Sequence, residues 1–211
     1  MSTIPGFAGI IAPLTVIACI LAAISYSGWF SWTENSLSDL GGRGGVAADL
    51  FNLGLIVGGT LIAILGIGLI GDMAGRSRGR MGAAAVILGG VALFVAGIFT
   101  NGSGAANEVH LYASGLFFAL LIIALLLIGS ALAREQQERS LGLFIFKAGL
   151  FLFTAGAALL AGQLARGAMA FLEFLIAVGA SVCYALLGAR LLTKAPFRDR
   201  DGGCPIAPEG G

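Results

Sequence analysis

The sequence predicts an all-α fold, a bundle of six transmembrane helices with a short interfacial helical turn in the first loop on the outer side. Hydrophobic residues make up 58% of the 211 residues and charged residues only 11%, whereas ordinary soluble domains carry about 25% charged residues. Six apolar stretches each reach about 20 residues, the length that crosses a hydrocarbon core of about 30 Å. These observations exclude a water-soluble domain and predict a multi-pass membrane protein.

The six spans are separated by segments rich in glycine, arginine and other charged residues, such as 71–80 and 134–140. Residues 1–6 contain no lysine or arginine, and the first apolar run is longer than the core of a cleaved signal peptide. We therefore expect the first span to be retained as a helix. The predicted spans are 7–30, 49–70, 81–100, 109–133, 141–162 and 168–192.

Basic residues are distributed unequally between the two sides of this predicted bundle. One side has only Arg43 and Arg166. The other has ten of the 12 lysines and arginines, namely Arg76, Arg78, Arg80, Arg134, Arg139, Lys147, Arg190, Lys194, Arg198 and Arg200. Short cytoplasmic loops retain basic residues. We therefore expect a plasma-membrane protein with both termini in the cytoplasm.

The chain divides into two parts by composition. Residues 1–193 form the predicted transmembrane domain, and residues 194–211 contain three prolines and six charged residues. Such a composition cannot bury enough apolar surface to fold on its own, so we expect a flexible cytoplasmic tail. Cys19, Cys183 and Cys204 have no metal-binding spacing, and we interpret them as small packing residues.

The first outer loop, 31–48, is long and polar for so small a protein. Ser36 and Asp39 have the spacing of a capping box, with aspartate in place of the usual glutamate or glutamine. Gly41 and Gly42 follow as a natural stop. This pattern predicts a short helical turn on the membrane interface.

The same loop also contains apolar side chains. Trp32, Leu37 and Leu40 can bury apolar surface. We therefore expect the loop to fold against the outer mouth of the bundle.

Polar groups from several predicted helices collect at this outer end. His110 is the only histidine, and Glu173 lies about 7–8 Å beyond the start of its span. An ionisable group inside a membrane usually faces a cavity or a partner and marks a functional site. We predict that His110 and Glu173 line one pocket over which Asp39 closes. The candidate site consists of Ser36, Ser38, Asp39, Asn52, His110 and Glu173.

The chemistry of this site stays open at the level of sequence. A buried carboxylate needs a partner, and Glu173 has four candidates: a protonated His110, Arg43, Arg166 or a cation. A single histidine falls short of the two or three that catalytic zinc sites use. Ser36 or Ser38 could act as a nucleophile with His110 as its base. No catalytic residue is identified, and we expect no metal and no cofactor.

Several of these residues together resemble a known family. The resemblance rests on the loop sequence NSLSDLG at 35–41, on Asn52, on GIFT at 97–100, and on His110 and Glu173. The chain resembles, over residues 7 to about 192, the domain-of-unknown-function 998 family of prokaryotic six-helix membrane proteins. That family is distantly similar to the FRAG-like and DRAM-like proteins of eukaryotes, some of which are linked to lipid remodelling. By analogy, the resemblance implies a role related to lipids.

Two classes of function remain, and they differ in whether the outer site is catalytic. The first is a lipid-binding protein or an accessory or structural component of a membrane complex. The alternative is an outward-facing lipid-modifying enzyme or hydrolase that uses Asp39, His110 and Glu173. Transport ranks last, because the spans contain few polar residues near the bilayer midplane.

The expected partners follow from the same features. They are membrane lipids and either another membrane protein or a second copy of the chain. With 12 basic and 11 acidic residues, the chain has no basic excess that would favour nucleic acid.

Overall fold

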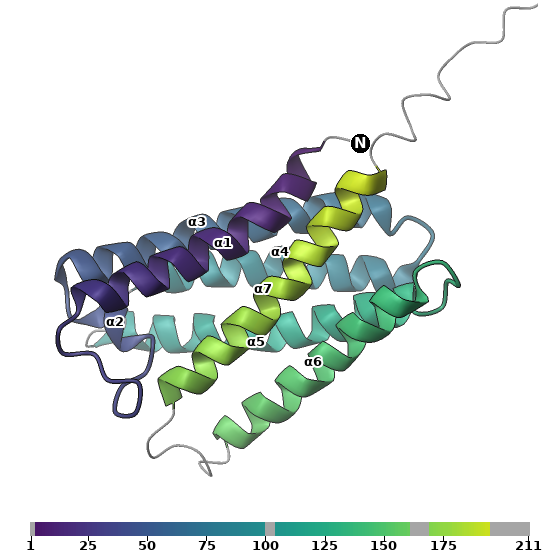
Figure 1. Ribbon diagram of the computed structural model, residues 1–211. Helices are drawn as coiled ribbons and strands as arrows, with labels where there is room; N and C mark the ends of the chain where they lie inside the picture. The colour runs from purple at the N-terminus through teal and green to yellow at the C-terminus, as the bar shows by residue number, and fades with distance from the viewer. Residues whose placement is uncertain (1–2, 100–103, 161–168, 195–211) are drawn as a thin grey trace, which may run out of the picture.

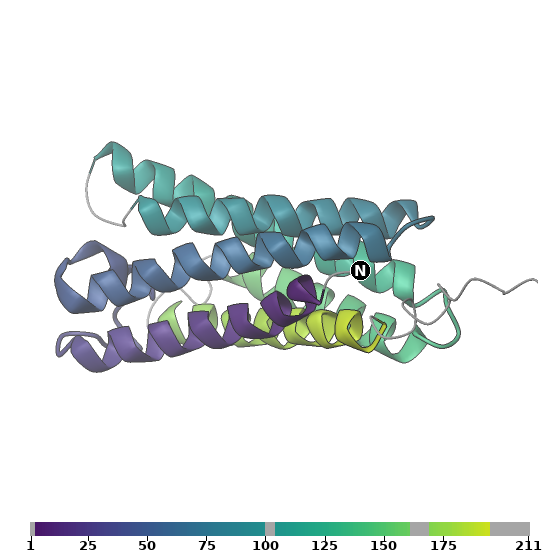
Figure 2. The same ribbon diagram turned by 90° about the horizontal axis from the view of Figure 1, so that it is seen from above.

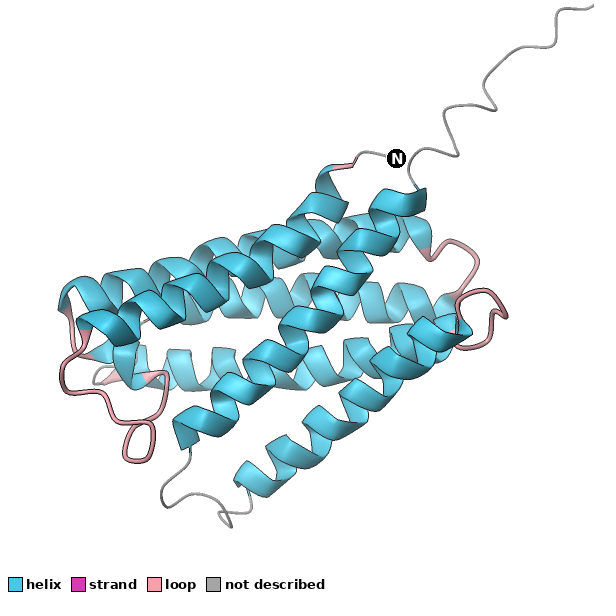
Figure 3. Ribbon diagram, in the orientation of Figure 1, coloured by secondary structure: helices cyan, strands magenta, loops and turns pink. Residues whose placement is uncertain are grey.

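The structure is a computed structural model that describes residues 3–99, 104–160 and 169–194. Every regular element in these ranges is a helix (Figure 3). The helices are α1 (Ile4–Tyr26), α2 (Asp39–Gly42), α3 (Gly45–Asp72), α4 (Ser77–Ile98), α5 (Ala105–Leu132), α6 (Arg139–Leu160) and α7 (Met169–Lys194). Six of them, all except α2, are long and apolar enough to cross a membrane. The predicted six-span fold and the helical turn are confirmed.

The observed helix boundaries fall within four residues of the predicted ones, and one difference of four residues lies at the end of α1. That helix ends at Tyr26, whereas the apolar run continues to Phe30. Trp29 and Phe30 extend the apolar run without belonging to the span, because they pack in an aromatic cluster in the loop.

The long helices form a closed ring in which each helix contacts the next (Figures 1 and 2). Helix α1 packs between α7 and α3, α3 packs on α4, α4 on α5, and α5 on α6. Helix α7 runs at a slant across the bundle and contacts α6 much less extensively than it contacts α1. The chain enters α1 and leaves α7 at the same end, as six spans require.

Glycines allow the closest helix approaches. A Cβ atom on Gly90 of α4 would lie 2.6 Å from the backbone oxygen of Gly59 in α3, and a Cβ on Gly59 would lie 2.5 Å from the oxygen of Gly90. Gly54 and Gly58 of α3 face α1 in the same way, where added Cβ atoms would meet the side chains of Cys19 and Val16. These small residues let the helix backbones approach each other closely.

Large apolar side chains are exposed on all sides of the bundle. Examples are Leu14, Ile67, Leu88, Leu116 and Phe151. A water-soluble protein does not expose so much contiguous apolar surface, whereas a hydrocarbon environment favours it. The interior is also apolar, so the polar groups described next are confined to the two ends of the bundle and to one cavity.

The loop after α1 is held by its own polar groups. The backbone N–H of Ser36 donates to Oδ2 of Asp39 at 2.9 Å, which is the backward-reaching half of a capping box. The predicted glycine stop was wrong. Gly41 and Gly42 lie inside α2, and the backbone turns into α3 at Gly44 and Gly45, with φ of 73° and 77°.

Gly41 has a different role from the one predicted. A Cβ atom there would lie 2.6 Å from Oδ1 of Asn52, and Nδ2 of Asn52 donates to the Gly41 carbonyl at 3.2 Å. Gly41 therefore lets α2 lie directly on α3.

Candidate functional site

The end of the bundle that carries α2 is here called the α2 end. There the loop is fastened to α7 by backbone and side-chain bonds. Glu173, in the second turn of α7, accepts a hydrogen bond of 2.6 Å from the backbone N–H of Leu37. The Ala170 N–H donates to the Asn35 carbonyl at 3.2 Å. Leu37 and Leu40 are 5% and 0% exposed, so the loop folds onto the bundle as its apolar residues predict.

Aromatic rings continue this attachment. Trp32 contacts Phe30 and also Phe174 of α7, with ring centroids 5.5 and 5.4 Å apart. Arg43 lies over the ring of Trp29, 3.9 Å from its centroid, a cation–π contact. Arg43 is thus engaged by an aromatic ring, and Arg166, another proposed partner of Glu173, lies outside the described residues.

His110 occupies the second turn of α5 and is 4% exposed. Its Nδ1 lies 2.8 Å from the Ala96 carbonyl and 2.9 Å from the Phe99 carbonyl, at the end of α4. Carbonyl oxygens only accept hydrogen bonds, so Nδ1 carries a hydrogen. In the neutral imidazole Nε2 then carries the lone pair, and it lies 3.4 Å from the Ser114 hydroxyl, a long distance for a hydrogen bond.

A cavity of about 470 Å³ lies behind the loop. Its volume falls within the range of about 300–1,000 Å³ that is usual for small-molecule sites. Apolar side chains make up most of its wall: Pro13, Val16, Ile20, Leu37, Phe51, Leu55, Ile62, Leu93, Leu111, Phe117, Phe118, Leu121, Ile176, Ala177 and Ala180. Its polar lining residues are Ser38, Asn107, His110, Ser114, Glu173, Ser181 and Tyr184. The first five come from the loop and from the beginnings of α5 and α7, and so from the α2 end.

The structure brings three of the six candidate residues to this cavity: Ser38, His110 and Glu173. Asp39 caps Ser36, whose hydroxyl lies 2.8 Å from that of Ser38. Asn52 binds the carbonyl of Gly41. These residues shape the loop and are not among those that line the cavity.

Four polar residues of the cavity are not among the candidate site residues from the sequence, namely Asn107, Ser114, Ser181 and Tyr184. Ser114 and Asn107 lie one turn on either side of His110, and such spacing places side chains on one helix face. Tyr184 stands eleven residues after Glu173 in α7, on the same face three turns further on. Both relations follow from helical periodicity around the two residues already singled out.

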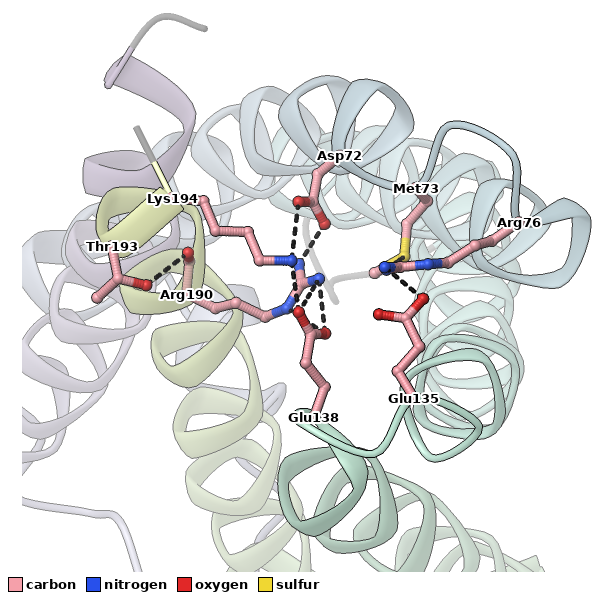
Figure 4. Close-up of polar contacts among 8 residues, drawn as sticks. All are labelled: Asp72, Met73, Arg76, Glu135, Glu138, Arg190, Thr193 and Lys194. Carbon is pink, nitrogen blue, oxygen red and sulfur yellow. Dashed lines mark hydrogen bonds and ion pairs between the residues drawn. The ribbon is translucent and has the colours of Figure 1, made fainter. Parts of the chain in front are cut away.

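The opposite end of the bundle, here called the Arg190 end, contains a second polar cluster (Figure 4). Arg190 of α7 pairs with Asp72 at the end of α3 and with Glu138 before α6, at 2.7 Å for the second pair. Lys194 joins both carboxylates. Burial of Glu138 raises its pKa, but the bonds and charges of Lys194 and Arg190 outweigh burial and leave the pKa below its ordinary value. The cluster ties three elements together without net charge.

The site at the α2 end therefore combines an apolar chamber with hydrogen-bonding groups at one end. In the described ranges, no three histidine, cysteine, aspartate or glutamate residues are placed to hold a metal ion. Cys19 and Cys183 are free thiols.

Fold and site together define a multi-pass membrane protein with a mainly apolar cavity. The model of the family described as "Protein of unknown function (DUF998)" matches residues 10–190, and the chain belongs to this family. Searches of curated proteins and of solved structures return no match. The more distant similarity to FRAG-like and DRAM-like proteins stays a prediction.

Proposed function

We propose that this protein binds a membrane amphiphile, with the apolar body of the ligand in the cavity and its polar head at the α2 end. The separation of polar and apolar lining is the observation that supports this function. A lipid-like molecule has the same division, and the chamber is wide enough to hold a substantial part of one. An accessory role in a membrane complex is compatible with such binding.

The head group of this ligand should donate hydrogen bonds. Glu173 offers carboxylate oxygen, and Nε2 of His110 offers a lone pair. None of the described lining residues is lysine or arginine. A phosphate or carboxylate head would meet an unfavourable charge, whereas a hydroxyl or amine head would be stabilised.

A cavity-filling variant tests this proposal. Ala177 lines the cavity from α7, and Ala185, on the same helix and also half-buried, does not. Ala177→Phe should abolish most binding of radiolabelled octadecan-1-ol to protein in nanodiscs, and Ala185→Phe should retain it. Equal binding by the two variants, or none by the unaltered protein, would contradict the proposal.

We also propose that the α2 end faces the outside of the plasma membrane and that both termini are cytoplasmic. The excess of lysine and arginine at the Arg190 end supports this orientation. In a variant lacking native cysteines, an impermeant thiol reagent should label Glu34→Cys in sealed cells and leave Ser77→Cys unlabelled. The reverse pattern would overturn the orientation.

A second candidate function is hydrolysis of an ester amphiphile. The fixed tautomer of His110, with Nε2 directed at the Ser114 hydroxyl, is the observation that favours it. The 3.4 Å contact is longer than a productive nucleophile–base bond of about 2.6–3.2 Å and would have to tighten with substrate. A fluorophosphonate probe should then label Ser114, and labelling should be lost in His110→Gln. Binding of the amphiphile without labelling of Ser114 would reject hydrolysis and retain only the amphiphile-binding function.

A further inference from the structure

The cavity has a second polar point, far from the first. Tyr184 is 2% exposed, and it lines the cavity wall on the same face of α7 as Glu173, Ala177, Ala180 and Ser181. Its hydroxyl is buried and has no hydrogen-bond partner among the described residues.

Neighbouring polar groups do not account for this hydroxyl. The hydroxyl of Ser181, one turn before it, donates to the Ala177 carbonyl at 2.7 Å. A buried hydroxyl without a partner is costly, and such groups normally bind protein, water or a ligand. Because Tyr184 is among the residues that line the cavity, a molecule in the cavity is a candidate partner for its hydroxyl.

We propose that the ligand carries a hydrogen-bond acceptor, such as a carbonyl oxygen, within its apolar body, and that Tyr184 binds it. This inference rests on the proposed amphiphile-binding function and specifies the ligand further. The class is an elongated amphiphile with a donor head and an internal oxygen.

The positions of Glu173 and Tyr184 set the spacing of these two groups. They are eleven residues apart in one helix, or about 16 Å along its axis at 1.5 Å per residue. An extended chain advances about 1.1–1.2 Å per bond, as the dimensions of an extended backbone indicate. The internal oxygen should therefore lie about 14 bonds from the head group.

Three probes of equal chain length test this spacing: octadecan-1-ol, the same alcohol with a ketone at carbon 13, and the same alcohol with a ketone at carbon 5. Binding is measured in nanodiscs by competition with the radiolabelled alcohol. The unaltered protein should bind the 13-ketone about threefold to tenfold more tightly than octadecan-1-ol, the usual effect of one added hydrogen bond. The 5-ketone should show no such gain.

Tyr184→Phe removes only the hydroxyl and is the matched variant. It should lose the preference for the 13-ketone over octadecan-1-ol. Equal binding of the three probes to the unaltered protein would overturn the inference and indicate that water satisfies Tyr184. A preference that survives in Tyr184→Phe would overturn it as well. Failure of every probe to bind would instead reject the proposed function, and this inference with it.

Discussion

One carboxylate, that of Glu173, joins the loop at the α2 end to the transmembrane helices. Its 2.6 Å bond from the Leu37 N–H is charge-assisted when the carboxyl group is ionised, and such bonds contribute about 1.5–3 kcal/mol against about 0.5–1.5 kcal/mol for neutral ones. The same side chain lines the cavity. Loop position and cavity chemistry are therefore coupled at a single residue.

Replacing Glu173 by glutamine should loosen the loop without removing the acceptor. The loss of charge weakens the bond by about 1 kcal/mol, so hydrogen exchange at the Leu37 amide should become about fivefold faster. Glu34→Gln, at an exposed position of the same loop, is the control and should leave this rate unchanged. An unaltered rate in Glu173→Gln would show that the carboxylate does not hold the loop.

Glu138 should make the stability of the Arg190 end depend on pH. Its folded-state pKa is below the ordinary value of about 4.3, so pairing stabilises the folded protein above that pH. The stabilisation is lost as pH falls through the folded-state pKa. The melting temperature of the unaltered protein should fall more steeply below about pH 4.3 than that of Glu138→Gln.

Glu135 provides the comparison for this pH dependence. It is 40% exposed and pairs with Arg76 at 2.5 Å, and exposed pairs contribute little. Glu135→Gln should therefore keep the steep decline of the unaltered protein. Matching pH profiles for Glu138→Gln and the unaltered protein would contradict the role given to Glu138.

Individual site residues could be predicted from the sequence where their side-chain chemistry is unusual for a membrane span. A lone histidine and a carboxylate near helix starts at one end were sufficient to single out His110 and Glu173. The hydrogen-bond partners of these two side chains could not be predicted from the sequence. They are backbone groups of Leu37, Ala96 and Phe99, and every residue has such groups. Tyr184 carries no sequence signal apart from its register with Glu173.

Between elements, the α3–α4 contact depends on glycines that face each other. A Cβ on Gly90 would lie 2.6 Å from backbone atoms of Gly59 and Ala63, and backbone cannot move aside as a flexible side chain can. Gly115 of α5 has no atom within 4 Å of the corresponding position. The same substitution should therefore have opposite effects at the two sites.

Gly90→Ala should destabilise the protein by about 1–3 kcal/mol through overpacking. Gly115→Ala should have no cost and should gain up to about 1 kcal/mol from helix propensity. Denaturant titration in mixed micelles would measure both changes. Equal losses at the two positions would refute close α3–α4 packing at Gly90.

Helix α7 is anchored at its far end by Arg190, whose removal should be costly. Arg190→Met would leave Asp72, with a side chain only 6% exposed, paired with Lys194 alone. Removing one partner of a buried ion pair destabilises by about 3–5 kcal/mol. Arg78→Met, at an exposed position near the same end, should change stability by less than about 0.5 kcal/mol.

Neutralising the partners should separate packing from charge. If Arg190→Met acts through unpaired carboxylates, adding Asp72→Asn and Glu138→Gln should recover most of the lost stability. A triple variant as unstable as Arg190→Met would assign the effect to packing instead.

The six transmembrane spans could be predicted because the length and apolarity of a segment are local properties of the sequence. The ends of the helices do not follow from these properties. Trp29 and Phe30 extend the apolar run beyond α1 because they pack in the loop. The two glycine pairs after Asp39 are alike in sequence. In the structure Gly41 lies against Asn52, whereas Gly44 and Gly45 have positive φ.

The order of helices around the bundle lay beyond sequence reasoning, because all six have apolar residues on every face. The cavity depends on that order, since α1, α3, α5 and α7 contribute most of its wall. Sequence placed polar groups at one end of the molecule. It did not reveal that several of them line one end of an apolar cavity.

At the scale of the whole molecule, the proposed function requires that this cavity holds the apolar body of an amphiphile. Photolabelling with an octadecan-1-ol carrying a diazirine at mid-chain tests it directly, since mass spectrometry locates the labelled residues. Labels should fall on cavity residues such as Leu121, Ile176 and Ala180, and excess octadecan-1-ol should reduce them. Labels confined to exposed residues such as Ile67, Leu88 and Phe151, with no effect of competitor, would contradict it.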